Sequence, residues 1–171
     1  MTLKPSRLIV PMSLLTLVAC AQSPTPATDT PTAGAVSCLS TSTSLNATGA
    51  AATNQARKAA GLAPVRPSNL LAKVAAAHAC DMARTGRVVH QGSTTSGPAE
   101  RVKARGYDTR ITAENIAAGP FDTDRVLAEW QKSPGHRANI LLPQVEEFGI
   151  GQAVGPDGRT QYWAAVYAAQ K

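Results

Sequence analysis

The chain has 171 residues, which is enough for one folded domain with its own core and too few for two. Its 17 Lys and Arg residues outnumber 11 Asp and Glu residues and give a net charge of +6. The basic residues are scattered, and aromatic residues make up only 4% of the chain. The stacking surfaces typical of nucleic-acid-binding proteins are therefore lacking, and we expect no nucleic-acid partner.

Residues 1–19 have the features of a bacterial lipoprotein signal peptide. Lys4 and Arg7 form a charged head, and the apolar run that follows is too short to span a bilayer. The run ends in Leu-Val-Ala-Cys, which resembles a lipobox, with the cysteine at position 20. We therefore expect Cys20 to be lipidated and to anchor the protein to the cell membrane or the outer membrane. The alternative is an ordinary secretory signal that leaves Cys20 as a free thiol.

Residues 20–37 contain the cysteine and a segment dominated by Pro, Thr and Ala. Such a composition cannot bury enough apolar surface to fold, and its prolines keep the backbone extended. We expect a disordered tether that holds a folded domain, residues 38–171, away from the membrane.

Two further cysteines, Cys38 and Cys80, fall within the expected domain. An even number of cysteines in an oxidising compartment indicates a disulfide, which would join the start of the domain to its second helix. The alternative is two unpaired cysteines, one of them buried as a small apolar group.

Helical patterns occupy the first part of the domain. Caps and glycine stops predict helices from Ser44 or Asn46 to Ala60, from Ser68 or Asn69 to Arg84, from Ala99 to Arg105, from Asp122 or Thr123 to Lys132, and one more turn over 136–142. The second of these helices has an apolar stripe that includes His78, which we expect in the core.

The C-terminal part changes to a period of two. Alternating residues from 148 and a run over 161–167 flank Gly155-Pro156-Asp157-Gly158, which predicts a β-hairpin. Residues 107–118 are expected to be extended or irregular. Helices first and antiparallel strands last indicate an α+β fold, and the large aromatic residues are expected to fill its helix–sheet core: Trp130, Tyr162, Trp163 and Tyr167.

Several short motifs occur in a fixed order over residues 45–169. They are Asn54-x-x-Arg57-x-x-x-Gly61-Leu62-x-Pro64, Ala76-x-His78-x-x-Asp81-Met82-Ala83, Val89-His90, Arg101-x-x-x-x-Gly106-Tyr107, Ala113-Glu114-Asn115-Ile116-Ala117, Trp130-x-x-Ser133-Pro134-Gly135-His136-Arg137-x-Asn139-Ile140-Leu141 and Gly149-Ile150-Gly151. Together they resemble the bacterial branch of the CAP superfamily, also called SCP-like, which includes cysteine-rich secretory, antigen-five and pathogenesis-related proteins. The resemblance implies a three-layer α-β-α sandwich with a central antiparallel sheet, and a cleft lined by two histidines and two acidic residues.

Three cleft residues transfer from this resemblance. His90 matches the histidine that follows the second helix, Glu114 matches the Glu of the Glu-Asn motif, and His136 matches the histidine of the Gly-His motif. The second acidic residue does not transfer, because the position three after the tryptophan is Ser133 here. Glu129, just before the tryptophan, would face the cleft only if its helix were rotated. Both stay as candidates for the fourth position.

Two neutral imidazoles beside a carboxylate can bind a divalent ion such as zinc, so His90 and His136 are candidate metal ligands. Some relatives bind metal in this cleft, but the compact His-Glu-x-x-His spacing of metalloproteases is absent. The competing interpretation is a structural polar network in which Glu114 locks its loop. We expect no catalytic residue, because Ser133 and His136 lack a nucleophile elbow and an oxyanion hole. Arg101 and Arg137 are expected to be solvated surface arginines, the alternative being that they bind an anionic ligand at the rim of the cleft.

The sequence therefore favours an extracytoplasmic, lipid-anchored protein with one SCP-like CAP domain. Its expected role is the non-catalytic binding of a small ligand, a lipid or a cell-wall component through the cleft of His90, Glu114 and His136. The alternatives are a metal-dependent, protease-like hydrolase that uses the same residues and a structural or adhesive envelope module.

Overall fold

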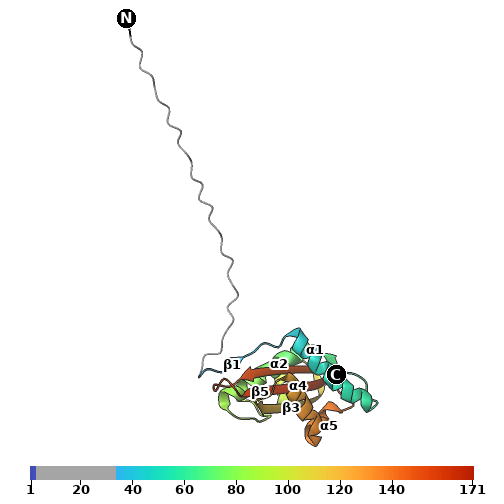
Figure 1. Ribbon diagram of the computed structural model, residues 1–171. Coiled ribbons are helices and arrows are strands. Elements are labelled where there is room, and N and C mark those ends of the chain that lie inside the picture. Colours follow the sequence, from blue (N-terminus) through green and yellow to red (C-terminus); the bar gives the residue numbers. More distant parts are fainter. Residues whose placement is uncertain (3–33) are drawn as a thin grey trace.

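A computed structural model describes residues 1–2 and 34–171 (Figure 1). The expected signal peptide from residue 3 onward, Cys20 and most of the tether lie outside the described residues. The elements in chain order are β1 (Ser37–Cys38), α1 (Thr43–Ala59), β2 (Arg66–Pro67), α2 (Asn69–Thr85), α3 (Pro98–Lys103), β3 (Thr109–Gly119), α4 (Thr123–Lys132), α5 (Pro134–Ile140), β4 (Glu147–Val154) and β5 (Gln161–Gln170). No described helix is both long and apolar enough to cross a membrane.

The strands form one sheet in the order β1-β4-β5-β3, with β2 pairing in parallel with β4. The other pairs are antiparallel, so the predicted hairpin is confirmed as β4 and β5. The segment predicted as extended or irregular forms β3, an edge strand paired with β5 along its length. This pairing joins residues far apart in the sequence, and the local pattern of residues 107–118 does not reveal it.

Strand β5 supplies the core of both helical layers, because its side chains alternate between the two faces of the sheet. Tyr162, Ala164, Val166 and Ala168 pack with residues of α2 and α3. Trp163, Ala165 and Tyr167 pack on the other face with residues of α1, α4 and α5. The chain is thus the expected α+β, three-layer α-β-α sandwich, and the four large aromatic residues predicted to fill its core are buried.

Most helix boundaries follow the predicted caps. Ser68 and Asp122 cap α2 and α4 as predicted, with side-chain oxygens that accept hydrogen bonds from backbone amides. Helix α1 begins earlier than predicted, because Ser42 is its cap. Asn46 is instead buried and links Ser68 to Ile150, which ties α1 to the loop before α2 and to β4. Helix α5 also begins early, because a proline is well tolerated in the first turn of a helix.

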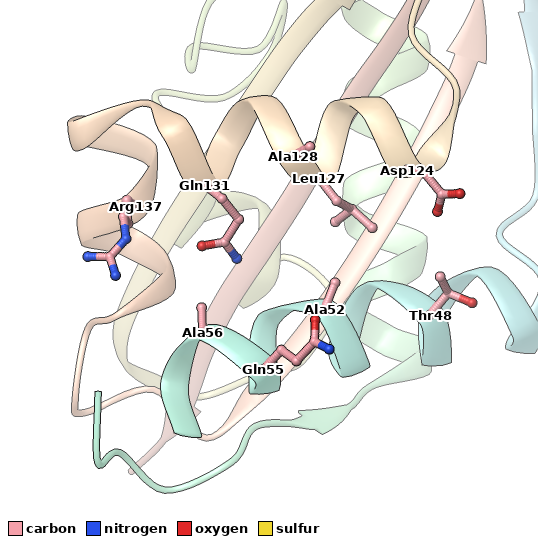
Figure 2. A pocket seen from close by; sticks show the side chains of 9 residues that line it. All are labelled: Thr48, Ala52, Gln55, Ala56, Asp124, Leu127, Ala128, Gln131 and Arg137. Atoms are coloured by element: carbon pink, nitrogen blue, oxygen red, sulfur yellow. The ribbon is translucent and has the colours of Figure 1, made fainter. Parts of the chain in front are cut away.

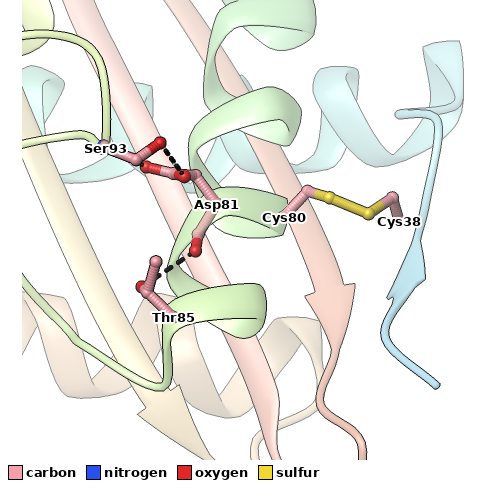
Figure 3. The surroundings of a disulfide bond; sticks show 5 residues. All are labelled: Cys38, Cys80, Asp81, Thr85 and Ser93. Atoms are coloured by element: carbon pink, nitrogen blue, oxygen red, sulfur yellow. Dashed lines mark hydrogen bonds between the residues drawn. A yellow bond between two sulfur atoms is a disulfide. The ribbon is translucent and has the colours of Figure 1, made fainter.

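The disulfide between Cys38 and Cys80 is present, with 5.1 Å between the two Cα atoms (Figure 3). It fixes β1 against α2, as the cysteine count predicted. Strand β1 begins at Ser37, so the ordered domain starts slightly before the expected boundary at residue 38. The amide of Gly34 also donates to the carbonyl of Pro156 at 3.0 Å.

Helix α2 lies directly against β4, and two glycines make this approach possible. A Cβ atom at Gly149 would collide with the backbone of Leu71 and Ala72, and one at Gly151 with the backbone of Ala76. Any side chain at either position would push α2 away from the sheet. The position of α2 matters for the site, because this helix leads into the segment that carries His90.

We predict that Gly151→Ala lowers the free energy of unfolding by about 2–3 kcal/mol, since backbone atoms cannot move aside as a flexible side chain can. Gly135→Ala is the matched control, because a Cβ there meets nothing within 4 Å and alanine favours a helix. Urea unfolding of both variants measures the effect. Equal stability of the two variants would show that the glycines do not set the helix–sheet distance.

Candidate functional site

The site is built around a buried carboxylate in the middle of β3. Glu114 is 3% exposed, and both of its oxygens accept hydrogen bonds. Oε1 accepts from Nδ1 of His90 at 2.9 Å, and Oε2 accepts from Nη2 of Arg101 at 2.5 Å. A charged carboxylate is stable in such a position only when it is paired and hydrogen-bonded. Glu114 lies in strand β3, and its bonds to His90 and Arg101 form a polar network that holds the loop after α2.

Arg101 is a buried member of this network, so the prediction of a solvated arginine is wrong. Its Nη1 donates to the carbonyl oxygen of His90 at 2.9 Å and to Oγ1 of Thr95 at 3.3 Å. The guanidinium thus connects α3 to β3 and to the loop after α2. Sequence alone did not identify this role, because the ion-pair partner lies on another element and only the fold brings the two together.

His90 is the exposed end of the network, with 58% of its side chain accessible. Because Nδ1 contacts the carboxylate of Glu114, this nitrogen carries the proton when the ring is neutral. The lone pair of Nε2 is then free to accept a hydrogen bond or to bind an ion. A carboxylate that fixes the tautomer and orientation of an imidazole is a common support for a binding histidine.

His136 lies in the first turn of α5 and is held by two asparagines. The Nδ2 of Asn115 donates to the carbonyl oxygen of His136 at 3.1 Å. The Nδ2 of Asn139 donates to the Oδ1 of Asn115 at 2.9 Å and to the carbonyl oxygen of Glu114 at 3.0 Å. Backbone and side-chain bonds therefore fix α5 to β3 next to Glu114.

The imidazole of His136 is half-buried, and its ring centre lies 6.4 Å from the ring of Trp130. Burial lowers the pKa of His136, and the charge of nearby His90 lowers it further. The ring of His136 is therefore neutral at pH 7. The structure thus places the three residues transferred by the resemblance near the middle of β3.

The two candidates for the fourth position are not joined to these three residues. Glu129 is partly exposed and accepts from Nζ of Lys132 at 3.2 Å. Ser133 connects α4 to α5, and its carbonyl oxygen accepts from the amide of Arg137. Within the described part, no hydrogen bond or ion pair links either residue to His90, Glu114 or His136. A cleft role for Glu129 or Ser133 stays a prediction.

His78 is buried in the core as predicted, but it also borders the carboxylate. It is 1% exposed, and its Nε2 lies 3.0 Å from the carbonyl oxygen of Val89 and 3.7 Å from Oε1 of Glu114. The carbonyl is an acceptor, so Nε2 carries the proton. Sequence reasoning placed this histidine in the core from its helical position but missed its contact with the polar network.

The binding of a divalent metal by His90 and His136 remains a prediction. Over residues 34–171, no three His, Cys, Asp or Glu side chains are grouped so that they could hold a metal ion. Glu114 is already bonded to Arg101 and His90, which leaves the two imidazoles as the candidate ligands. The described residues therefore do not form the closed four-ligand site of a structural zinc.

A groove of about 530 Å³ lies elsewhere, between α1 and α4 (Figure 2). Small apolar side chains and Leu127 face it from the two helices, and Arg137 lies at the end near α5. None of the predicted cleft residues lines this groove. Arg137 is exposed as predicted, but it borders the groove.

We predict that Arg101→Met lowers the free energy of unfolding by about 3–5 kcal/mol, because it leaves the carboxylate of Glu114 buried without its charged partner. Arg110→Met is the control, since the pair of Arg110 with Glu146 is exposed and worth at most about 1 kcal/mol. The double variant Arg101→Met/Glu114→Met should regain most of the loss, because no buried charge remains. Urea unfolding at pH 7 tests all three, and a cost for Arg101→Met no larger than that for Arg110→Met would contradict the buried pair.

The fold matches solved structures of bacterial surface and secreted proteins. An outer surface protein from Borrelia burgdorferi matches with a TM-score of 0.67 at 19% identity, over 75% of this chain and 95% of that chain. An extracellular protein containing an SCP domain from Bacillus anthracis str. Ames matches with a TM-score of 0.65 at 25% identity, over 75% of this chain and 41% of that chain.

A similar sequence is the uncharacterized protein YkwD of Bacillus subtilis (strain 168), which is 35% identical over 99 residues. The match covers 58% of this chain but only 38% of the length of YkwD. Residues 50–167 match the CAP family, described as the cysteine-rich secretory protein family. This match spans nearly all of the described sandwich, so the chain belongs to the CAP, or cysteine-rich secretory protein, family.

Proposed function

We propose that this protein is a lipid-anchored, extracytoplasmic binding module. Its CAP domain would bind a small ligand, a lipid or a cell-wall component at the cleft of His90 and His136, without a chemical step. The family and the outer-surface and extracellular relatives support a place outside the cytoplasm. The charged head, apolar run and lipobox-like sequence before Cys20 support the anchor.

The observation that carries the non-catalytic role is the state of Glu114. A general base needs an oxygen within hydrogen-bond reach of the proton that it takes from a substrate. Both oxygens of Glu114 already accept bonds inside the protein, from His90 and Arg101. Glu114 is therefore suited to position His90, and the groups left for a ligand are the two imidazoles.

These imidazoles suit a ligand with hydrogen-bond donors or a loosely held ion. The ring of His90 is exposed, and its Nε2 is the nitrogen that does not contact Glu114. The ring of His136 is neutral at pH 7, because burial and the charge of His90 lower the pKa of His136. Since the pKa of His136 lies below the ordinary value of 6.5, binding to its neutral form should persist as the pH falls from 7 to 6.5. Binding should weaken only below that range, when the ring gains a proton.

We predict that His90→Ala/His136→Ala weakens co-sedimentation with bacterial envelope material by at least about tenfold in Kd. The probes are purified bacterial sacculi and vesicles of phosphatidylglycerol with phosphatidylcholine. Circular dichroism checks the fold of the variant. Ala128→Gln is the control, because it changes the groove between α1 and α4 and leaves the cleft intact.

Three results would overturn the proposal. Unchanged binding by the histidine variant would show that the cleft is not the binding surface. Failure of the wild type to bind either probe would show that the domain does not bind these envelope materials. Release of soluble fragments from either probe, detected by mass spectrometry and lost in the histidine variant, would replace binding with hydrolysis. Repeating the assay with zinc and with a chelator shows whether an ion takes part.

We also predict that Cys20→Ala moves the protein from the membrane fraction to the soluble fraction of cells that express the full chain. A lipidated cysteine supplies acyl chains that hold a protein at a membrane, whereas alanine supplies none. Immunoblots of fractionated cells measure the change. Equal membrane retention of Cys20→Ala and the wild type would refute the lipid anchor.

A further inference from the structure

A second recess, of about 320 Å³, lies between α2, α3 and the loop over residues 92–95. We call it the α2–α3 recess. His90, Glu114 and His136 do not line it. Its wall does include His78 and Arg101, whose other atoms belong to the network around Glu114.

Two buried polar atoms at this wall have no hydrogen-bond partner. They are Nδ1 of His78 and Nε of Arg101, on side chains that are 1% and 9% exposed. Buried polar atoms in native proteins nearly always have a partner, so each unpaired one requires an explanation. Both side chains line the same recess, so a group bound there is the candidate partner for the two atoms.

The chemistry of the two atoms defines that group. Burial lowers the pKa of His78, so its ring is neutral at pH 7, and its Nε2 donates to Val89. Nδ1 is therefore an acceptor that lacks a donor. The Nε–H of Arg101 is a donor that lacks an acceptor. A hydroxyl group can serve both atoms at once, since it donates one hydrogen bond and accepts others.

The rim of the recess is basic. Arg84 and Arg105 are exposed on it, and Lys73 shares an adjoining hollow with Arg105. Across the described residues, none of these three cations takes part in an ion pair. A cluster of unpaired cations attracts an anion.

The wall also holds one carboxylate, Asp81, whose single negative charge is outnumbered by the positive charges of Arg84 and Arg105. Asp81 is occupied by Ser93, as Figure 3 shows. Its Oδ1 accepts from Oγ of Ser93 at 2.6 Å, and its Oδ2 accepts from the amide of the same residue at 2.8 Å. These bonds fix the loop that closes the recess and direct Asp81 toward that loop.

We propose that the α2–α3 recess binds a polyol phosphate. A hydroxyl of the ligand would lie between His78 and Arg101, and its phosphate would lie against Arg84 and Arg105. The same chemistry is found in a free molecule such as glycerol 1-phosphate and in the headgroup of phosphatidylglycerol. The site is separate from the histidine cleft, so it does not depend on the function proposed above.

The test is calorimetric titration of the full chain, purified in a non-ionic detergent, with glycerol 1-phosphate, inorganic phosphate and glycerol. Glycerol 1-phosphate should bind at least about tenfold more tightly than either fragment, because only it reaches both the buried atoms and the rim. Equal binding of inorganic phosphate would show a surface charge effect alone. No binding of glycerol 1-phosphate would mean that ordinary water occupies the recess. Either result overturns the proposal.

Two variants with matched controls locate the site. Ala77→Leu fills the recess from an exposed helical position without changing its charge, and its control is Ala51→Leu at an exposed position of α1.

Arg84→Gln/Arg105→Gln removes the positive charge of the rim, and its control is Arg159→Gln in the exposed β4–β5 turn. Both recess variants should weaken glycerol 1-phosphate binding by at least about tenfold, and the controls should not. An unchanged affinity in Ala77→Leu would contradict the site.

Vesicle binding then separates the two sources of the ligand. A preference for phosphatidylglycerol over phosphatidylserine vesicles, lost in Ala77→Leu, would assign the recess to the lipid headgroup. Binding of glycerol 1-phosphate without such a preference would assign it to a free polyol phosphate. His90→Ala/His136→Ala should leave the binding of soluble glycerol 1-phosphate unchanged, so this titration distinguishes failure of the cleft from failure of the recess.

Discussion

The buried charge of Glu114 is the constraint on which the site depends. A carboxylate inside a protein is costly unless donors surround it, and here the donors come from elements distant in the chain. Arg101 brings α3 to β3, and His90 brings the segment after α2. The residues that satisfy Glu114 are therefore also the residues that fix the geometry of the cleft.

Asn115, the residue after Glu114, links β3 to the other helical layer. Successive side chains of a strand point to opposite faces, so Asn115 points away from Glu114. It bonds to the carbonyl of His136 and to Asn139, both on α5. One edge strand thus holds two histidines, His90 in the loop after α2 through Glu114 and His136 on α5 through Asn115. These bonds restrain the loop that carries His90.

Two glycines of β4 also affect the site, because they set the position of α2 against the sheet. Gly149 and Gly151 let α2 rest against the sheet, and the disulfide ties that helix to β1. The close position of α2 brings His78 within 3.7 Å of the carboxylate and places its second nitrogen at the α2–α3 recess. His78 and Arg101 therefore belong both to the polar network around Glu114 and to the wall of the recess.

The sequence by itself determined the helices, the C-terminal hairpin and the fold class, and it named three candidate site residues. Caps, glycine stops and apolar periods are local signals, so they predicted the helices and the C-terminal hairpin, and the order of the motifs indicated the family. The tertiary structure alone decided that β3 is a strand, that Arg101 is buried and that Glu114 has both oxygens occupied. It also left Glu129 and Ser133 without a contact to the cleft. The physical reason is that burial and ion pairing depend on partners far away in the chain, whereas the sequence pattern reports only on neighbours.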